Sequence, residues 1–208
     1  MTDTTRPQAA TQPDTGQSRR RAVVLAWITV AWNAVEAVVA FIAGAAADSL
    51  ALVGFALDST IEVASAAVII WQFAGLDEER ERHALRLIAV SFYALAAYVG
   101  VQALFDLANQ NEPDTTGLGL GIVILSLIVM PVLARAKSDV GRQLGSASVS
   151  ADSQQTWLCM YLSAVVLGGL LLNGAFGWWW ADPIAALVIA GLAIREGRSA
   201  WQGDNCCG

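Results

Sequence analysis

Charge is scarce in this sequence. Asp, Glu, Lys and Arg make up 14% of its 208 residues, against about 25% in soluble domains. Apolar residues are abundant, at 56% even without counting glycine. A water-soluble fold of this length has too little interior to bury so much apolar surface. The composition therefore excludes an ordinary soluble enzyme.

The sequence also has few cysteines, and its N-terminal segment lacks core-forming residues. Its three cysteines, Cys159, Cys206 and Cys207, include an adjacent pair, which excludes a scaffold held together by disulfides. Residues 1–21 contain no aromatic and no branched aliphatic side chain. Such a segment has nothing to offset the entropy lost on ordering. We therefore expect a disordered tail over residues 1–21.

Six apolar stretches follow this tail. Each is long enough to cross a bilayer as an α-helix, an element that satisfies its own backbone hydrogen bonds there. We therefore predict an all-α membrane protein with six transmembrane helices, at residues 22–47, 50–75, 84–107, 117–133, 153–172 and 178–194.

The basic residues predict the orientation of these spans. With six spans, all 12 Lys and Arg residues fall on the side that holds both termini, and the opposite loops carry only acids such as Asp48. Because basic residues collect on the cytoplasmic side, both termini are expected in the cytoplasm. A twin-arginine signal peptide at 18–47 is the alternative interpretation. It is disfavoured because the stretch is too long, contains Asn33 and Glu36, and precedes five more spans.

Two carboxylates lie near the middle of the second predicted span. Asp58 and Glu62 are spaced i and i+4, which places them on one helix face. Buried carboxylates are costly in a bilayer and usually functional, and this pair favours binding either a proton or a divalent cation. No lysine or arginine lies inside the predicted spans beyond their cytoplasmic ends. We therefore expect no buried base to pair with these acids.

The fifth predicted span begins with a stripe of potential ligands. Asp152, Gln155 and Cys159 are spaced i, i+3 and i+7 and share a face. Because the second span enters from outside and the fifth from the cytoplasm, Glu62 and Cys159 reach a similar depth. Carboxylates, an amide oxygen and a thiolate suit Zn²⁺, and the thiolate disfavours Mg²⁺ and Ca²⁺. Asp152 is expected one helix turn nearer the cytoplasm, on the access path.

Some of these residues have simpler interpretations. Cys159 could be a small buried hydrophobe, and Gln155 could be an amide that only packs against a neighbouring helix. In the first span, Asn33 and Glu36 could form an access path or hydrogen-bond neighbouring helices, and the sequence does not decide between these roles.

At these residues the chain resembles the membrane domain of the cation diffusion facilitator family. Residues 48–52 followed by 58–62 are similar to the second span of that family, where a Ser-x-Ala-Leu sequence precedes two acids four apart. Residues 151–159 are similar to its fifth-span pattern Ala-Asp-x-x-His-x-x-x-Asp, and residues 180–186 to the opening of its sixth span. The similarity covers about residues 22–200. This chain departs from the pattern by carrying Glu at the second acid position of the second span, and Gln and Cys in place of the fifth-span His and Asp.

The predicted function is that of a secondary transporter, not an enzyme. It would export a divalent transition metal, Zn²⁺ or a similar ion, in exchange for protons and without a prosthetic group. Asp58 and Glu62 are predicted to be the main ligands and proton carriers, with Cys159 and Gln155 completing the shell and Asp152 on the access path. We therefore expect a multi-pass protein of the cytoplasmic membrane.

The predicted organisation has three parts: a disordered cytoplasmic tail (1–21), the six-helix domain (22–198) and a short cytoplasmic tail with a cysteine pair (199–208). The resemblance implies a homodimer. Few residues follow the sixth span, so the soluble metal-binding domain common in the family is not expected, and the dimer would form through the membrane helices. We expect no nucleic-acid partner. Cys206 and Cys207 could bind a soft metal, carry a palmitoyl group or have no role.

Two other functions are compatible with the sequence. The altered fifth-span pair and the lack of a soluble domain leave open a membrane protein that binds or senses metal, or regulates a partner, without transport. An intramembrane aspartyl protease is disfavoured, because it would present its two aspartates on different helices.

Overall fold

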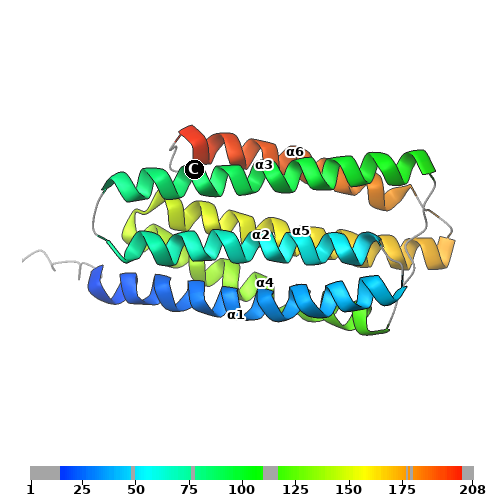
Figure 1. Cartoon of the computed structure of the whole chain (residues 1–208), viewed down its shortest axis with the longest axis horizontal. Coiled ribbons are helices and arrows are strands. Elements are labelled where there is room, and N and C mark those ends of the chain that lie inside the picture. The colour runs from blue at the N-terminus through cyan, green and yellow to red at the C-terminus, as the bar shows by residue number, and fades with distance from the viewer. Residues whose placement is uncertain are drawn as a thin grey trace, which may run out of the picture.

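The protein is a bundle of antiparallel helices (Figure 1). The computed structural model describes residues 15–47, 50–75, 78–109, 117–176, 178 and 180–202. Within these ranges the chain forms six α-helices and no strand. The helices are α1 (Thr15–Ala47), α2 (Leu50–Phe73), α3 (Glu78–Asn109), α4 (Gly117–Leu144), α5 (Ala147–Phe176) and α6 (Ala181–Gln202).

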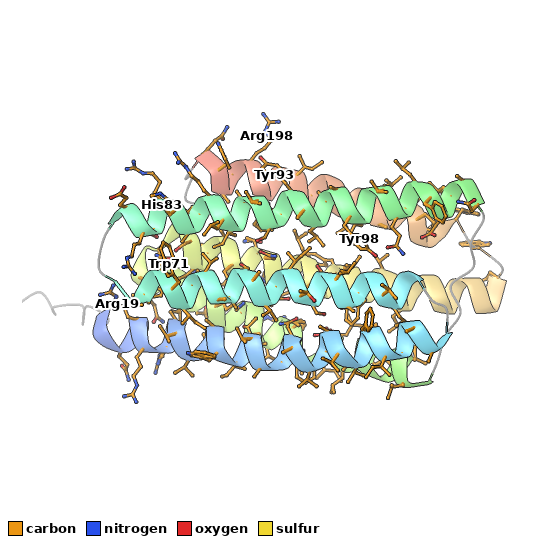
Figure 2. The ribbon with its side chains drawn as sticks, viewed as in Figure 1. Arg19, Trp71, His83, Tyr93, Tyr98 and Arg198 are labelled. Carbon is orange, nitrogen blue, oxygen red and sulfur yellow. The ribbon has the colours of Figure 1, made fainter. Side chains whose placement is uncertain are left out.

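The helices pack as three close pairs, α1 with α2, α3 with α6, and α4 with α5. In Figure 1, α2 lies between α1 and α3, with α4 and α5 behind them. The start of α1 and the end of α6 point toward the same end of the bundle. Arg19, His83 and Arg198 lie in that half and Tyr98 lies in the other (Figure 2). Two of the arginines that the sequence assigns to one side, Arg19 and Arg198, therefore lie toward the same end of the bundle.

The bundle buries polar side chains among the apolar ones of its core, and it exposes many large apolar side chains on its surface. On α1, Thr29, Asn33 and Glu36 are fully buried, while Val38 and Phe41 are 59% and 56% exposed. In water, exposing so many apolar side chains would be unfavourable. In a bilayer they contact lipid tails that are equally apolar, so their exposure carries no such cost. Helices α1 to α4 each contain a stretch that is long and apolar enough to cross a membrane.

A tight turn joins α4 to α5 and fixes which residues face each other across the pair. Gly145 has a φ of +60°, which glycine adopts without steric cost. Its N–H donates to Arg142 O, and the N–H of Ser146 donates to Gly141 O, a Schellman arrangement that ends α4. Gly141 also lets the helices approach closely, because a Cβ there would lie 2.8 Å from Ser150 Oγ.

Several helices extend beyond the predicted spans. Helix α1 begins at Thr15, so residues 15–21 are helical and not part of a disordered tail, and α4 continues to Leu144 instead of ending at 133. Hydropathy marks the apolar part of a helix, whereas backbone hydrogen bonding continues into its polar ends. Residues 1–14 and the Cys206–Cys207 pair lie outside the described residues.

Candidate metal centre

The acids predicted in the second span face the interior of the bundle. Asp58 and Glu62 lie one turn apart on α2, and each is 1% exposed. Ser59 and Thr60 donate their hydroxyls to backbone carbonyls one turn back on α2. These hydroxyls therefore do not satisfy the two carboxylates. Oδ2 of Asp58 and Oε2 of Glu62 have no hydrogen-bond partner.

Helix α5 places the predicted thiol beside these carboxylates and buries the predicted amide one turn away. Cys159 and Gln155 are each 1% exposed. The Cys159 thiol lies close enough to donate a hydrogen bond to the carboxylate of Asp58 or of Glu62. Neither the oxygen nor the nitrogen of the Gln155 amide has a partner. The structure thus brings Asp58, Glu62 and Cys159 together, while Gln155 is buried one turn from Cys159 on α5. Their role as metal ligands stays a prediction.

A third carboxylate joins them from α1. Glu36 is fully buried, it lies near Asp58, Glu62 and Cys159, and Ser126 of α4 is also beside it. Neither of its carboxylate oxygens makes a well-formed hydrogen bond, although the hydroxyl of Ser126 and the indole of Trp32 lie nearby. The sequence signalled Glu36 only as an acid inside an apolar span and did not assign it to the site.

Unpartnered polar atoms of this kind are costly. A buried polar group without a hydrogen bond costs several kcal/mol in an apolar medium, and native proteins leave few such groups. Here they include oxygens of three carboxylates and of the Gln155 amide, contributed by α1, α2 and α5. Because these are oxygen donors without a protein partner, the cluster fits a cation or protons as its missing partners.

The structure corrects the expectation that no base is buried among the acids. Lys137 of α4 is 2% exposed, and its Nζ lies 2.8 Å from Asp152 Oδ2 and 3.8 Å from Glu62 Oε1. The same ammonium donates to Thr156 Oγ1 over 2.9 Å. The sequence placed Lys137 in a loop because the apolar stretch ends at 133, but α4 continues and turns this residue inward.

Asp152 is consequently a paired acid. Its Oδ1 accepts a hydrogen bond from Ser65 at 2.9 Å, and its Oδ2 is bound by Lys137. Both carboxylate oxygens have partners, in contrast to the orphan oxygens of Asp58 and Glu36. Its predicted role on a cytoplasmic access path stays a prediction.

Glu62 is shared between the two groups of residues. Thr156 donates to Glu62 Oε1 over 2.6 Å, on the side where Lys137 lies, while Oε2 has no partner. Among the residues that the structure describes, no three His, Cys, Asp or Glu side chains stand close enough together to hold one ion. The donor groups therefore lie near one another without converging on a single point.

Polar contacts continue from this cluster toward the basic end of the bundle. Ser148 donates to Gln72 Oε1 over 2.6 Å, and Ser146 donates to Glu81 Oε1 over 2.7 Å. These residues lie near the α4–α5 turn, at the end of α2 and at the start of α3. They form a group of hydrogen-bonded polar side chains near that end of the bundle.

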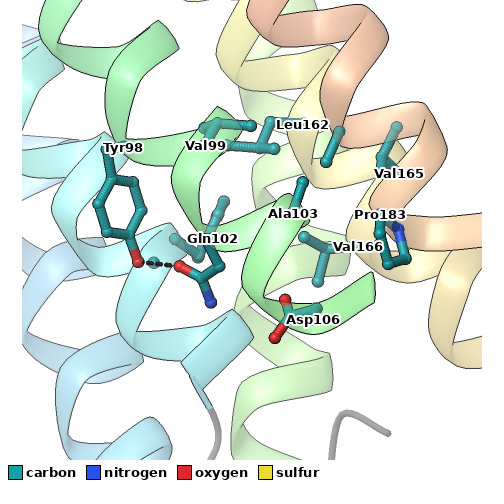
Figure 3. Close-up of a pocket in the computed structure, with 12 residues that line it drawn as sticks. Tyr98, Val99, Gln102, Ala103, Asp106, Leu162, Val165, Val166 and Pro183 are labelled. Carbon is teal, nitrogen blue, oxygen red and sulfur yellow. Dashed lines mark hydrogen bonds between the residues drawn. The ribbon is translucent and has the colours of Figure 1, made fainter. Parts of the chain in front are cut away.

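A small cavity lies on the other side of the cluster (Figure 3). Its volume is about 50 Å³, and α3 supplies its polar lining through Tyr98, Gln102 and Asp106. The Tyr98 hydroxyl donates to Gln102 Oε1. Residues of α2 and α5 one turn beyond Asp58 and Cys159 line it as well. The acidic cluster thus has polar groups on both sides along the bundle axis.

Comparison with known proteins supports a transporter family. The family described as the cation efflux transmembrane domain matches residues 26–200. Transmembrane protein 163 of Xenopus laevis is 28% identical over 183 residues, which cover 86% of this chain and 65% of that protein.

Two relatives with transport activities in their names match shorter segments. The cation-efflux pump FieF of Shewanella oneidensis is 30% identical over 100 residues, which cover 48% of this chain and 32% of the pump. The cadmium, cobalt and zinc/H(+)-K(+) antiporter of Bacillus subtilis is 26% identical over 108 residues, which cover 52% of this chain and 34% of the antiporter. The chain thus spans less than two thirds of the length of these relatives.

Proposed function

The chain belongs to the cation efflux family, and we propose that it exports a divalent transition metal, Zn²⁺ or a similar ion, in exchange for protons. The observation that supports this most is the group of unpartnered buried oxygens on Glu36, Asp58 and Glu62. Ionisable groups inside a membrane bundle are expensive and mark ion or proton pathways. A dication or protons would satisfy them.

The donor chemistry favours a borderline or soft metal over Mg²⁺ or Ca²⁺. Cys159 offers a thiolate, which hard cations bind poorly. Asp58 and Glu62 add carboxylate oxygens and Gln155 an amide oxygen, a donor set that fits four-coordinate Zn²⁺. Similarity to an antiporter named for cadmium, cobalt and zinc points to the same group of ions.

We infer exchange for protons from the cost of burying ionised carboxylates that have no cation beside them. After a dication departs, Asp58 and Glu36 would be unneutralised carboxylates in a low-dielectric interior, and Glu62 would have only the ammonium of Lys137, 3.8 Å away and shared with Asp152. Protons taken up from the opposite compartment would neutralise them and complete the cycle. The name of the antiporter from Bacillus subtilis includes H(+) exchange.

Access from both sides would alternate around this fixed cluster. The polar contacts of Ser146, Ser148, Gln72 and Glu81 would form the inner route. The cavity beside Tyr98 would belong to the outer route. Rocking of the helix pairs against one another would open one route while closing the other.

The membrane arrangement is part of the proposal. All six helices would span the cytoplasmic membrane, with both termini in the cytoplasm, because the basic ends of the helices lie together and such ends stay inside. Two copies would pair through membrane-facing helix surfaces to form a homodimer.

The test is Zn²⁺ flux into proteoliposomes that contain a Zn²⁺-sensing dye and carry an imposed pH gradient. Asp58→Asn and Glu62→Gln should each reduce the initial rate of Zn²⁺ flux by about a hundredfold or more. Each substitution removes a negatively charged carboxylate that would bind the transported metal. Glu79→Gln, an exposed acid at the start of α3, is the matched control and should transport normally.

Two results would contradict the proposal. Normal flux in Asp58→Asn and Glu62→Gln would show that the cluster is not the transport site. Stoichiometric Zn²⁺ binding by the unmodified protein with no flux under any gradient would favour the alternative, a membrane protein that binds metal and does not transport it.

A further inference from the structure

Lys137 occupies a position that the proposed transport cycle does not yet explain. It is the only lysine in the chain, and it is almost completely buried. Its ammonium lies between a carboxylate that it binds at 2.8 Å, Asp152, and one that it approaches to 3.8 Å, Glu62. Burying an ammonium is expensive unless it is paired, and other basic residues of the helices, such as Arg142, remain exposed.

The surroundings of Lys137 hold it at this point. Thr156 links Glu62 to the lysine, because its hydroxyl accepts from Lys137 Nζ and donates to Glu62 Oε1. Ser65 fixes the other oxygen of Asp152 from the α2 side. The ammonium is therefore anchored on Asp152 and directed toward Glu62.

We propose that the Lys137 ammonium is a tethered cation that shares Glu62 with the transported dication, so that the Lys137–Asp152 pair sets the affinity of the site without touching the metal. The proposal rests on the proposed function, since it takes Glu62 as a ligand. It also accounts for the open arrangement of the donors, because Glu62 Oε1 is engaged on the lysine side while Oε2 points away without a partner.

The charges of the pair act on the metal in opposite directions. Lys137 repels a dication and competes for Glu62, whereas Asp152 holds the lysine back and offsets its charge. Removing only the lysine should strengthen binding of the dication and slow its release. Removing only Asp152 should let the ammonium move fully onto Glu62 and weaken binding.

The experiment measures Zn²⁺ affinity of the purified full chain in detergent, by competition with a chelating dye, for four proteins: wild type, Lys137→Gln, Asp152→Asn and the double variant. We expect Lys137→Gln to bind about tenfold more tightly and Asp152→Asn about tenfold more weakly than wild type. The double variant, which loses both charges together, should return to within about threefold of wild type.

The double variant also decides between the two roles of Asp152. If Asp152, which the sequence places in the stripe of potential ligands, were itself a metal ligand, the double variant would bind as weakly as Asp152→Asn. That result overturns the proposal. If Lys137→Gln fails to fold, the comparison of Asp152→Asn with the double variant gives the same decision, because removing both charges leaves no unpaired one.

Flux measurements separate this role from a structural one. In proteoliposomes Lys137→Gln should lower both the KM for Zn²⁺ and the maximal rate, since tighter binding retards release, whereas a damaged fold would not lower KM. Asp58→Asn, measured in parallel, should bind Zn²⁺ poorly. Equal affinities in all four proteins with Asp58→Asn impaired would overturn only the role of Lys137, whereas normal binding by Asp58→Asn would overturn the proposed function as well.

Discussion

Two buried carboxylates of the same bundle differ in their hydrogen-bond partners. We call the surroundings of Asp152 the paired layer and those of Asp58 the unpartnered layer. Asp152 and Asp58 are both 1% exposed. Asp152 has a partner on each oxygen, Ser65 and Lys137, whereas Asp58 leaves Oδ2 without one. Burial alone therefore does not distinguish the two acids, which differ in whether the protein supplies a partner for each carboxylate oxygen.

The largest expected effect on stability is at the paired layer. Asp152→Asn should lower the free energy of unfolding by about 1.5–3 kcal/mol, the range for hydrogen bonds to charged groups, because it takes the anchoring charge from Lys137. Asp58→Asn should leave stability unchanged or raise it, because it removes a charge that the protein does not neutralise. Denaturant titration of the metal-free protein in mixed micelles measures both. Equal losses in the two variants would contradict the comparison.

A smaller effect, on Zn²⁺ affinity and not on stability, is expected at the unpartnered layer. Glu36→Gln should weaken Zn²⁺ binding by about tenfold, because it removes one of three clustered carboxylates and the attraction it exerts on a dication. It should leave the stability of the metal-free protein unchanged. The same dye competition measures the affinity, with Glu79→Gln as the control. An unchanged affinity would assign Glu36 to helix packing alone.

Glu36 and Lys137 also mark the limit of what the sequence could predict. The pairing of Asp58 with Glu62 follows from helical periodicity, and their proximity to Cys159 follows from the depth at which two antiparallel spans enter. The α-helical class and the inward direction of these side chains were predictable for the same reason, because a bilayer penalises every other arrangement of backbone and charge.

The rest depends on packing that no local pattern encodes. The position of Glu36 beside Asp58 depends on how α1 rotates against α2. The burial of Lys137 depends on a helix that continues past its apolar stretch and on the turn at Gly145. A lysine just after an apolar run is typical of an interfacial loop, and only the register between α4 and α5, which places it against Asp152, identifies it as an interior residue.

The smallest effect is expected at a second ion pair on the same helix. Asp139 and Arg142 of α4, two and five residues after Lys137, form a bridge whose side chains are 61% and 63% exposed. Arg142→Ala should change the free energy of unfolding by less than about 0.5 kcal/mol, because exposed pairs gain little over hydration and are screened by salt.

Zn²⁺ affinity should also stay at the wild-type value in Arg142→Ala, which makes this variant the control for any nonspecific effect of removing a positive charge from α4. Raising the salt concentration should abolish even its small effect on stability while leaving that of Asp152→Asn intact, because salt does not reach the buried pair. A loss of stability in Arg142→Ala as large as that in Asp152→Asn would mean that net charge near the α4–α5 turn, and not the partnering of individual buried acids, governs this part of the bundle.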